Sequence, residues 1–210
     1  MLGVLAMLTT TLLTAMARSR EPGQRIGCAN NLRQLGVAIL IYSSENDGMF
    51  PPRSSTNRWP ARLLRYYGAL AILRCPNDGT NPATFGGPSL ADRAPRSFIL
   101  NGWDDYFNTA LPALPLSIPE QAIPHPSQTI AFGEKATDSG HFTVDTSATD
   151  DLTQVEYSPH FRSNPANVTS GGSNFAMADA QVVFLKHGTG LAPTDLWYVL
   201  DQYRTNSLSP

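Results

Sequence analysis

The N-terminal part of the chain changes from uniformly apolar to amphipathic. Residues 1–17, MLGVLAMLTTTLLTAMA, carry no charged side chain. A helix needs about 20 apolar residues to cross a bilayer, so this segment is a short candidate for a membrane anchor. A cleaved secretory signal is the alternative, because the small residues Ala15 and Ala17 suit a cleavage site. No basic residue precedes the apolar run, and this favours the anchor.

After the anchor candidate, apolar residues recur at helical spacing. They are Cys28, Leu32, Leu35, Ile39 and Tyr42. Steps of four and three positions place these residues on one face of a helix. Pro22 lies between the two patterns, and because proline removes a helical hydrogen bond we expect an interruption or kink there. We predict a long helix over residues 1–45, whose second half lies against a globular head of residues 46–205.

Beyond residue 46 the predicted elements are short. Helical periodicity predicts amphipathic helices over Trp59–Leu70 and Leu196–Tyr203, whereas residues 81–95 have no periodicity. Strand-like runs occupy residues 97–100, 129–132, 141–144, 173–178 and 181–186. The last two form a predicted hairpin around Asp179, although Ala180 is less suited than glycine to the positive φ of such turns. A helix followed by strands predicts an α+β fold with a small antiparallel sheet and long irregular loops.

Composition agrees with one head domain plus a helix. The 210 residues are 41% hydrophobic and 15% charged, and they include 17 prolines and 16 glycines, so the head should be rich in turns. Fifteen basic and seventeen acidic residues leave a net charge of −2 without a basic run. This distribution excludes a nucleic-acid partner of the usual kind.

Two cysteines, Cys28 and Cys75, are the only ones in the chain. In an envelope protein such a pair is compatible with one disulfide, whereas a CxxC redox or metal motif is absent. Two unpaired, half-buried thiols are an equal alternative, and both interpretations stay open at this point.

Several segments resemble prepilin-type, pseudopilin-like proteins that are abundant in Planctomycetes and Verrucomicrobia. In that family a Cys-x-Asn-Asn-Leu-Lys/Arg-Gln-x-Gly segment is followed by Tyr, Asp-Gly and Phe-Pro-Pro. Residues 28–36 read CANNLRQLG here, and Tyr42, Asp47-Gly48 and Phe50-Pro51-Pro52 follow. Residues 75–78, 97–102 and 172–179 are similar to further family segments.

The resemblance implies a type IV pilin-like fold and a structural, non-enzymatic role. It implies a single-pass protein of the bacterial inner membrane, with the head in the periplasm or outside the cell. The expected partners are the membrane and other pilin-like subunits or further copies, in a type II secretion or type IV pilus-like assembly. No cofactor is expected. Arginines at positions 18, 20, 25 and 33 would by themselves place this flank in the cytoplasm. The resemblance implies the opposite orientation, and a basic leader such as relatives carry would supply positive charge on the other side of the membrane segment.

The chain departs from the family pattern at two places. Relatives carry a histidine nine residues before an Asp-Gly pair, whereas here Asp179 precedes Ala180 and the nearest matching histidine is His160. The prepilin peptidase motif Gly-Phe-Thr-Leu-Ile-Glu is absent, and residues 1–6 are similar to the middle of the family's hydrophobic helix. We therefore expect the natural start to lie upstream of Met1.

The residues that could act in catalysis or bind a metal do not form a recognisable catalytic motif. The four histidines are widely spaced, so linear spacing predicts no zinc site, and no Gly-x-Ser-x-Gly segment exists. A hydrolase would require Glu134, His160 and Asp179 to converge. Acidic residues that suit a calcium loop are Asp47, Asp104, Asp105 and Asp145, although turn formation explains them more simply.

A second functional class remains open beside the structural role. The chain could be a membrane-anchored binding module that recognises a carbohydrate or a peptide through its long loops, residues 81–95 and 101–126. Such a module needs no assembly. Cross-linking in the membrane discriminates between the two, because assembly predicts ladders and a lone binding module predicts monomers.

Overall fold

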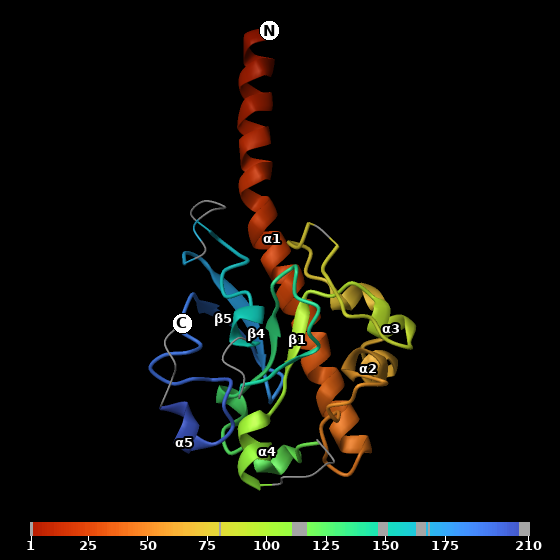
Figure 1. Ribbon diagram of the computed structural model, residues 1–210. Coiled ribbons are helices and arrows are strands. Elements are labelled where there is room, and N and C mark those ends of the chain that lie inside the picture. Colours follow the sequence, from red (N-terminus) through yellow and green to blue (C-terminus); the bar gives the residue numbers. More distant parts are fainter. Residues whose placement is uncertain are drawn as a thin grey trace.

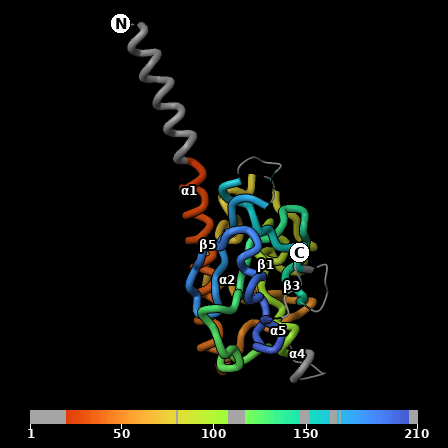
Figure 2. Tube along the Cα trace, turned by 90° about the vertical axis from the view of Figure 1, so that its left-hand side faces the viewer, coloured from red at the N-terminus to blue at the C-terminus, as the bar shows by residue number. Residues whose placement is uncertain are grey.

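A computed structural model describes residues 2–79, 81–110, 117–146, 151–162, 167 and 169–205, except for the side chains of 2–19, 108–110 and 151. Its fold is α+β, as predicted. The C-terminal part of helix α1 (Leu2–Glu45) lies along one face of a five-stranded sheet, and the N-terminal part projects beyond the head (Figure 1). Figure 2, turned by 90°, shows the described part of α1 on one side of the head, with the sheet next to it.

The sheet is mixed rather than purely antiparallel. Its strands are β1 (Phe98–Asn101), β2 (Ile130–Glu134), β3 (Thr143–Val144), β4 (Gly172–Met177) and β5 (Val182–Lys186), in the order β3-β1-β2-β4-β5. The β1–β2, β2–β4 and β4–β5 pairs are antiparallel, and the predicted hairpin is confirmed as β4–β5. Strand β3 instead runs parallel to its neighbour β1, with Leu100 opposite Thr143.

Helix α1 continues through Pro22, so the expected interruption is wrong, whereas the alternative expectation of a kink stays a prediction. Pro22 is partly exposed at the point where the helix begins to contact the head, and solvent can there hydrate the carbonyl that proline leaves without a donor. The helix ends at Glu45, close to the predicted end. Asp47 and Gly48 follow with φ of 54° and 73°, the left-handed conformation that commonly stops a helix.

The predicted apolar stripe of α1 is the face that meets the sheet. Cys28, Leu32, Leu35 and Ile39 are each fully buried. A Cβ added at Gly36 would lie 3.0 Å from the Cα of Ala180, in the β4–β5 turn. The absence of a side chain at this position therefore lets the helix approach the hairpin closely.

Short helices surround this core. They are α2 (Trp59–Tyr67), α3 (Leu90–Arg93), α4 (Asp104–Ala110), α5 (Asp201–Arg204) and the 3₁₀ segments η1 (Leu70–Leu73), η2 (Glu120–Ala122), η3 (Pro126–Gln128) and η4 (Asp151–Gln154). Helix α2 confirms the helix predicted over Trp59–Leu70, and Gly68, at φ 82°, ends it where a break was expected. Helices α3 and α4 lie in segments for which the sequence predicts loops.

Both faces of the sheet are covered, which explains why most strand positions are buried. Phe98, Leu100 and Phe132 pack toward α1, α2 and η1, whereas Ile99, Phe175 and their neighbours pack against Trp197 on the opposite face. Strands buried on both faces read as continuous apolar runs rather than as alternation.

The predicted helix Leu196–Tyr203 is wrong over its first half. The backbone amide of Trp197 donates to Asp195 Oδ1 at 3.0 Å, and the amides of Val199 and Leu200 both donate to Asp105 Oδ2 at 2.8 Å. These carboxylates satisfy amides in a non-helical backbone, so helix α5 begins only at Asp201.

Among the described residues, none of the helices combines the length and the apolar character that a membrane span requires. The predicted anchor, residues 1–17, falls on α1 where side chains lie outside the described part of the structure.

Asp195 makes head stability depend on pH. The residue is 1% exposed, and burial raises its pKa to about 6 despite the amide of Trp197 and the charge of Arg204. Between about pH 4 and 6 the folded state therefore binds more protons than the unfolded state, and stability falls as pH rises. We expect Asp195→Asn to stabilise the head by about 1–3 kcal/mol at pH 8 and by progressively less toward pH 4.

Urea unfolding followed by circular dichroism at several pH values measures this difference. Asp179→Asn is the matched control, because Asp179 is exposed in a turn and accepts a local bond from the amide of Gln181 at 2.9 Å. A stability gain for Asp195→Asn that is equal at pH 4.5 and pH 8 would contradict the prediction.

Candidate functional site

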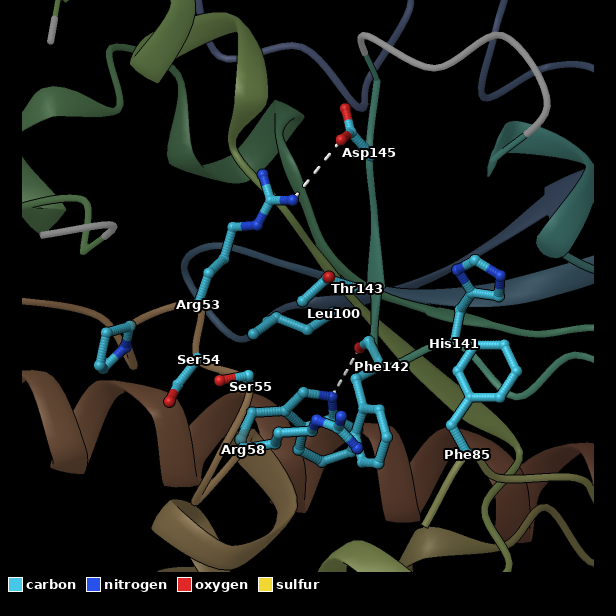
Figure 3. Close-up of a pocket in the computed structure, with 12 residues that line it drawn as sticks. Arg53, Ser54, Ser55, Arg58, Phe85, Leu100, His141, Phe142, Thr143 and Asp145 are labelled. Atoms are coloured by element: carbon cyan, nitrogen blue, oxygen red, sulfur yellow. Dashed lines mark hydrogen bonds and ion pairs between the residues drawn. The ribbon is translucent and has the colours of Figure 1, made fainter. Parts of the chain in front are cut away.

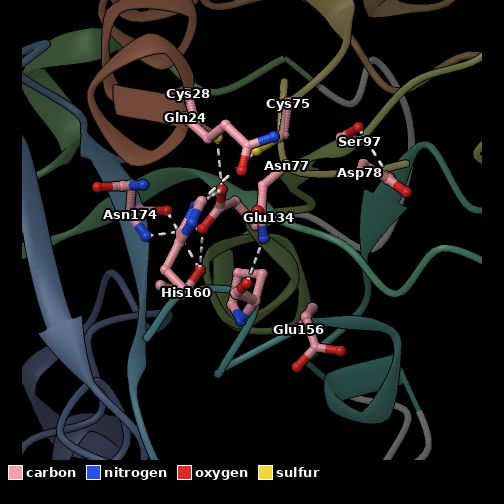
Figure 4. A network of polar contacts seen from close by, with 12 residues as sticks. Gln24, Cys28, Cys75, Asn77, Asp78, Ser97, Glu134, Glu156, His160 and Asn174 are labelled. Atoms are coloured by element: carbon pink, nitrogen blue, oxygen red, sulfur yellow. Dashed lines mark hydrogen bonds and ion pairs between the residues drawn. The ribbon is translucent and has the colours of Figure 1, made fainter. Parts of the chain in front are cut away.

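Four side chains of metal-ligating type meet in one buried place. They are Cys28 on α1, Cys75 after η1, Glu134 at the end of β2 and His160 in the segment before β4 (Figure 4). One ligand atom from each lies within 4.8 Å of all the others, and all four side chains are buried. We refer to these four residues as the four-ligand cluster.

The cysteine side of the cluster is built where α1 meets the loop after η1. Cys28 begins the buried stripe of the helix, so packing of that stripe directs its side chain into the head. The side chain of Asn31, one turn further along α1, donates to the carbonyl of Arg74 at 2.8 Å. This bond holds the residue before Cys75 against the helix, and the sulfur atoms of Cys28 and Cys75 consequently lie within 4.8 Å of each other.

His160 is positioned by its own backbone. Its amide donates to the carbonyl of Gly172 at 3.1 Å, and the amide of Gly172 donates back to its carbonyl at 3.0 Å. A Cβ at Gly171, which has φ 85°, would lie only 2.1 Å from the His160 carbonyl oxygen. Glycine is therefore required where this segment approaches the start of β4.

Glu134 connects the other members of the cluster. Its Oε2 accepts bonds from Ser173 Oγ at 2.7 Å and from the amide of Asn174 at 2.8 Å. Its Oε1 faces Cys28 Sγ at 2.5 Å and His160 Nε2 at 2.9 Å. One carboxylate oxygen is thus held by β4, and the other points into the cluster.

Burial and neighbouring charges shift the pKa values of all four side chains. Burial raises the pKa of Cys28 well above its ordinary value, and contact with Cys28 lowers the pKa of Cys75. For Glu134 burial acts upward, but the hydrogen bond and charge of His160 outweigh it and lower the pKa. For His160 burial acts downward, but contacts with Cys75 and Glu134 raise the pKa to about 9. Without a metal, the cluster is therefore an ion pair of Glu134 and His160 flanked by Cys28 and Cys75.

The structure brings together residues that the sequence singled out separately. Cys28 and Cys75 are adjacent as expected for a pair, yet both are free thiols, and they are buried rather than half-buried. Linear spacing indicated no set of zinc ligands, whereas the fold assembles two sulfurs, one imidazole and one carboxylate. No two of the four ligands are close along the chain, so spacing carried no signal for the set.

Asp179 does not join Glu134 and His160. His160 bridges Gly172 at the beginning of β4, whereas Asp179 follows the far end of that strand and is exposed. The convergence that a hydrolase would need from these three residues therefore does not occur.

The four calcium candidates are dispersed. Asp104 and Asp145 both pair with Arg53, whose guanidinium lies 3.5 Å from Asp145 Oδ2. Asp105 instead binds the backbone before α5, and Asp47 is exposed in the turn after α1. Asp104 and Asp145 are thus already paired with the same arginine side chain, which takes the place that a calcium ion would need.

A cavity of about 600 Å³ lies between the loop before α2 and strands β1 and β3 (Figure 3). Phe85 and His141 line it with their rings 4.9 Å apart, and Phe85 is 69% exposed. Arg58 lies over the ring of Phe142, 4.1 Å from its centroid, and Trp59 Nε1 donates to the Phe142 carbonyl at 2.7 Å. The cavity therefore combines aromatic rings with cationic groups.

Comparison with known proteins finds no matching family model, no matching curated protein and no matching solved structure. Function therefore has to be inferred from the residues and contacts of this chain.

Proposed function

We propose that this chain is a structural, pilin-like protein of the bacterial inner membrane. Its N-terminal segment anchors it, its head lies in the periplasm or outside the cell, and α1 packs against equivalent helices of further copies or of other pilin-like subunits. The assembly would be of the type II secretion or type IV pilus kind. The observation that carries this proposal is an exposed apolar row on α1, on the side away from the sheet.

Three large side chains form this row. Ile26, Val37 and Ile41 are 52%, 43% and 40% exposed. At about 100° per residue, steps of eleven and four positions place all three within about 60° of one another around the helix axis. Single exposed apolar residues are ordinary on protein surfaces, but a row along one helix provides a ridge that fits a second helix.

The opposite face of α1 is already used, because it packs against the sheet. Arg33 is exposed between Ile26 and Val37, so the row is amphipathic rather than wholly apolar. Such a surface suits contact between subunits near the membrane better than burial in lipid. The long helix and the family-like segment from Cys28 to Tyr42 support the same role.

Photo-cross-linking in intact membranes tests the proposal. A photoreactive amino acid at Val37 should produce ladders of dimers and higher species, because that position would contact a neighbouring helix. The matched control is the same amino acid at Leu90 on α3, which is 71% exposed and lies off the row. It should produce far fewer products.

Charge placed on the row should then break the contact without unfolding the head. The double variant Ile26→Glu, Ile41→Glu, which keeps the photoreactive amino acid at position 37, should lose the ladders, while the free energy of unfolding stays within about 1 kcal/mol of the parent because both positions are exposed. Monomers alone at Val37 would overturn the proposal. They would favour the alternative of an anchored module that binds a carbohydrate or a peptide, for which the cavity beside Phe85 is the candidate surface.

A further inference from the structure

We propose that Cys28, Cys75, Glu134 and His160 bind one zinc ion, which fastens α1 to the head. Two thiolates, an imidazole and a carboxylate are the ligand types that zinc uses in proteins, and four protein ligands are the number found in structural zinc sites. Two sulfur ligands also favour zinc over magnesium or calcium, which prefer oxygen. This proposal depends on the cluster alone and is independent of whether the chain assembles.

The distances suit a tetrahedral ion. Zinc bonds of about 2.0–2.3 Å place neighbouring ligand atoms about 3.3–3.8 Å apart. In the structure all four ligand atoms lie within 4.8 Å of one another, and Cys75 Sγ is 3.9 Å from His160 Nε2. The widest separation therefore exceeds the tetrahedral one by no more than about 1.5 Å. Glu134 Oε1 lies closer than the tetrahedral separation to Cys28 Sγ, at 2.5 Å, and to His160 Nε2, at 2.9 Å, and rotation of the side chains can remove both differences.

The residues behind the ligands hold them in place. Ser173 and the amide of Asn174 occupy Glu134 Oε2, so Oε1 remains for the metal. His160 is fixed by its two backbone bonds to Gly172. Outer contacts of this kind orient metal ligands and strengthen binding.

An ion has a polar route to the cluster. A cavity of about 240 Å³ borders Cys75 and Glu134, and its lining includes Lys135, Glu156 and Arg162. The side chains of Glu156 and Arg162 are 30% and 25% exposed, so this cavity lies near solvent. The ligand atoms themselves are buried, as in sites where a metal stabilises a fold rather than activating water.

Zinc accounts for more of the cluster than a disulfide does. A Cys28–Cys75 bond would use two of the four side chains and would leave Glu134 and His160 as a buried ion pair, a costly arrangement. Zinc uses all four and joins segments that are distant along the chain. Because Cys28 lies on α1 and the other three ligands lie in the head, the metal would fix the angle at which the helix leaves the head.

Cobalt titration of the full-length chain tests the site. The protein is purified in mild detergent, stripped of metal with a chelator under reducing conditions, and titrated with Co²⁺. We expect saturation at about one Co²⁺ per chain, with visible bands of a tetrahedral ion and thiolate-to-cobalt charge transfer in the near ultraviolet, and displacement by zinc. Adding chelator to the zinc form should expose both cysteines to a thiol reagent.

Variants assign the signal to the cluster. Cys75→Ser should abolish the tetrahedral spectrum, and Ser173→Ala should weaken zinc binding about 10–100-fold while retaining that spectrum. His125→Gln is the matched control, because His125 is 45% exposed at its side chain and pairs with Asp201 away from the cluster. It should bind cobalt as the parent does.

Three results would overturn the proposal. They are an octahedral or absent cobalt spectrum in the reduced parent, metal binding that His125→Gln removes, and a Cys28–Cys75 disulfide in protein isolated with zinc present. The titration of the parent needs no variant, so a variant that fails to fold does not obscure the outcome. Loss of the cross-link ladders at Val37 would leave these results unchanged.

Discussion

Replacing Glu134 with alanine is expected to destabilise the head by about 3–5 kcal/mol, because the change leaves a buried charge and several buried donors without a partner. Glu134 is 2% exposed and accepts bonds from Ser173, from the amide of Asn174, from Cys28 and from His160. Because these donors are themselves buried, the cost of desolvating them is retained in the folded state.

Urea unfolding with and without a chelator measures this effect. The chelated protein reports the loss of the hydrogen bonds and the ion pair, and the zinc-loaded protein adds the loss of a ligand. Glu134→Gln should fall between parent and alanine variant, since a glutamine oxygen can still accept from Ser173 and Asn174.

Glu156→Ala is the matched control for Glu134. Glu156 lines the same small cavity, but its side chain is 30% exposed, and it pairs with Arg162 at 2.8 Å and accepts from the amide of Ser158 at 3.1 Å. Exposed ion pairs contribute about 0–1 kcal/mol. If Glu134→Ala were no more destabilising than this control, the cluster would not hold the helix to the head as described.

Replacing Arg96 with alanine should cost about 2–4 kcal/mol, the second-largest effect that we expect. Arg96 is fully buried and donates to the carbonyls of Gly140 and His141 at 2.7 and 2.6 Å, and its guanidinium lies 3.6 Å from the ring centroid of Phe142. Burial disfavours the charged guanidinium and lowers the pKa of Arg96, so its removal recovers a desolvation cost that offsets part of the lost contacts. The cost of leaving the buried carbonyls unpaired is larger than this recovered desolvation cost.

The same substitution should loosen β3. Arg96 precedes β1, and its two carbonyl partners precede β3, so the side chain draws the two segments together where the parallel pair begins. Amide hydrogen exchange should therefore increase at Leu100 and Gly102, whose amides donate to the carbonyls of Phe142 and Val144.

Arg93→Ala provides the control for Arg96. Arg93 is three residues earlier, exposed, and donates to the Pro88 carbonyl at 3.2 Å. Its loss should change the free energy of unfolding by no more than about 0.5 kcal/mol. Equal effects of the two substitutions, or unchanged exchange at Leu100, would contradict the role assigned to Arg96.

The parts of the fold that were predictable from the sequence are those with local causes. The spacing of Cys28, Leu32, Leu35 and Ile39 determines which face of α1 is buried, because helical geometry relates positions three and four apart. The β4–β5 hairpin follows from two apolar runs joined by a short turn, and Ala180 takes φ of 66° there although it is not glycine. Neighbouring residues are sufficient to specify these elements.

Elements that depend on distant partners were predicted poorly. The periodicity of Leu196–Leu200 suits a helix, yet the carboxylates of Asp195 and Asp105 take its amides and hold it in another conformation. Strand β3 pairs in parallel with β1, next to a hydrogen bond between Arg96 and the carbonyl of His141, which are far apart in the sequence. Local propensity is a small term in free energy, and tertiary hydrogen bonds of buried groups exceed it.

The same division applies to the four-ligand cluster. The sequence by itself determined that Cys28 lies on the buried face of a long helix and that Glu134 follows an apolar strand. Only the tertiary structure decided that Cys75 and His160 meet them, because loops carry no periodicity and their paths are set by what they pack against. Metal ligands are chosen by distance in space, so the helix, the sheet and two loops must be in place before the site exists.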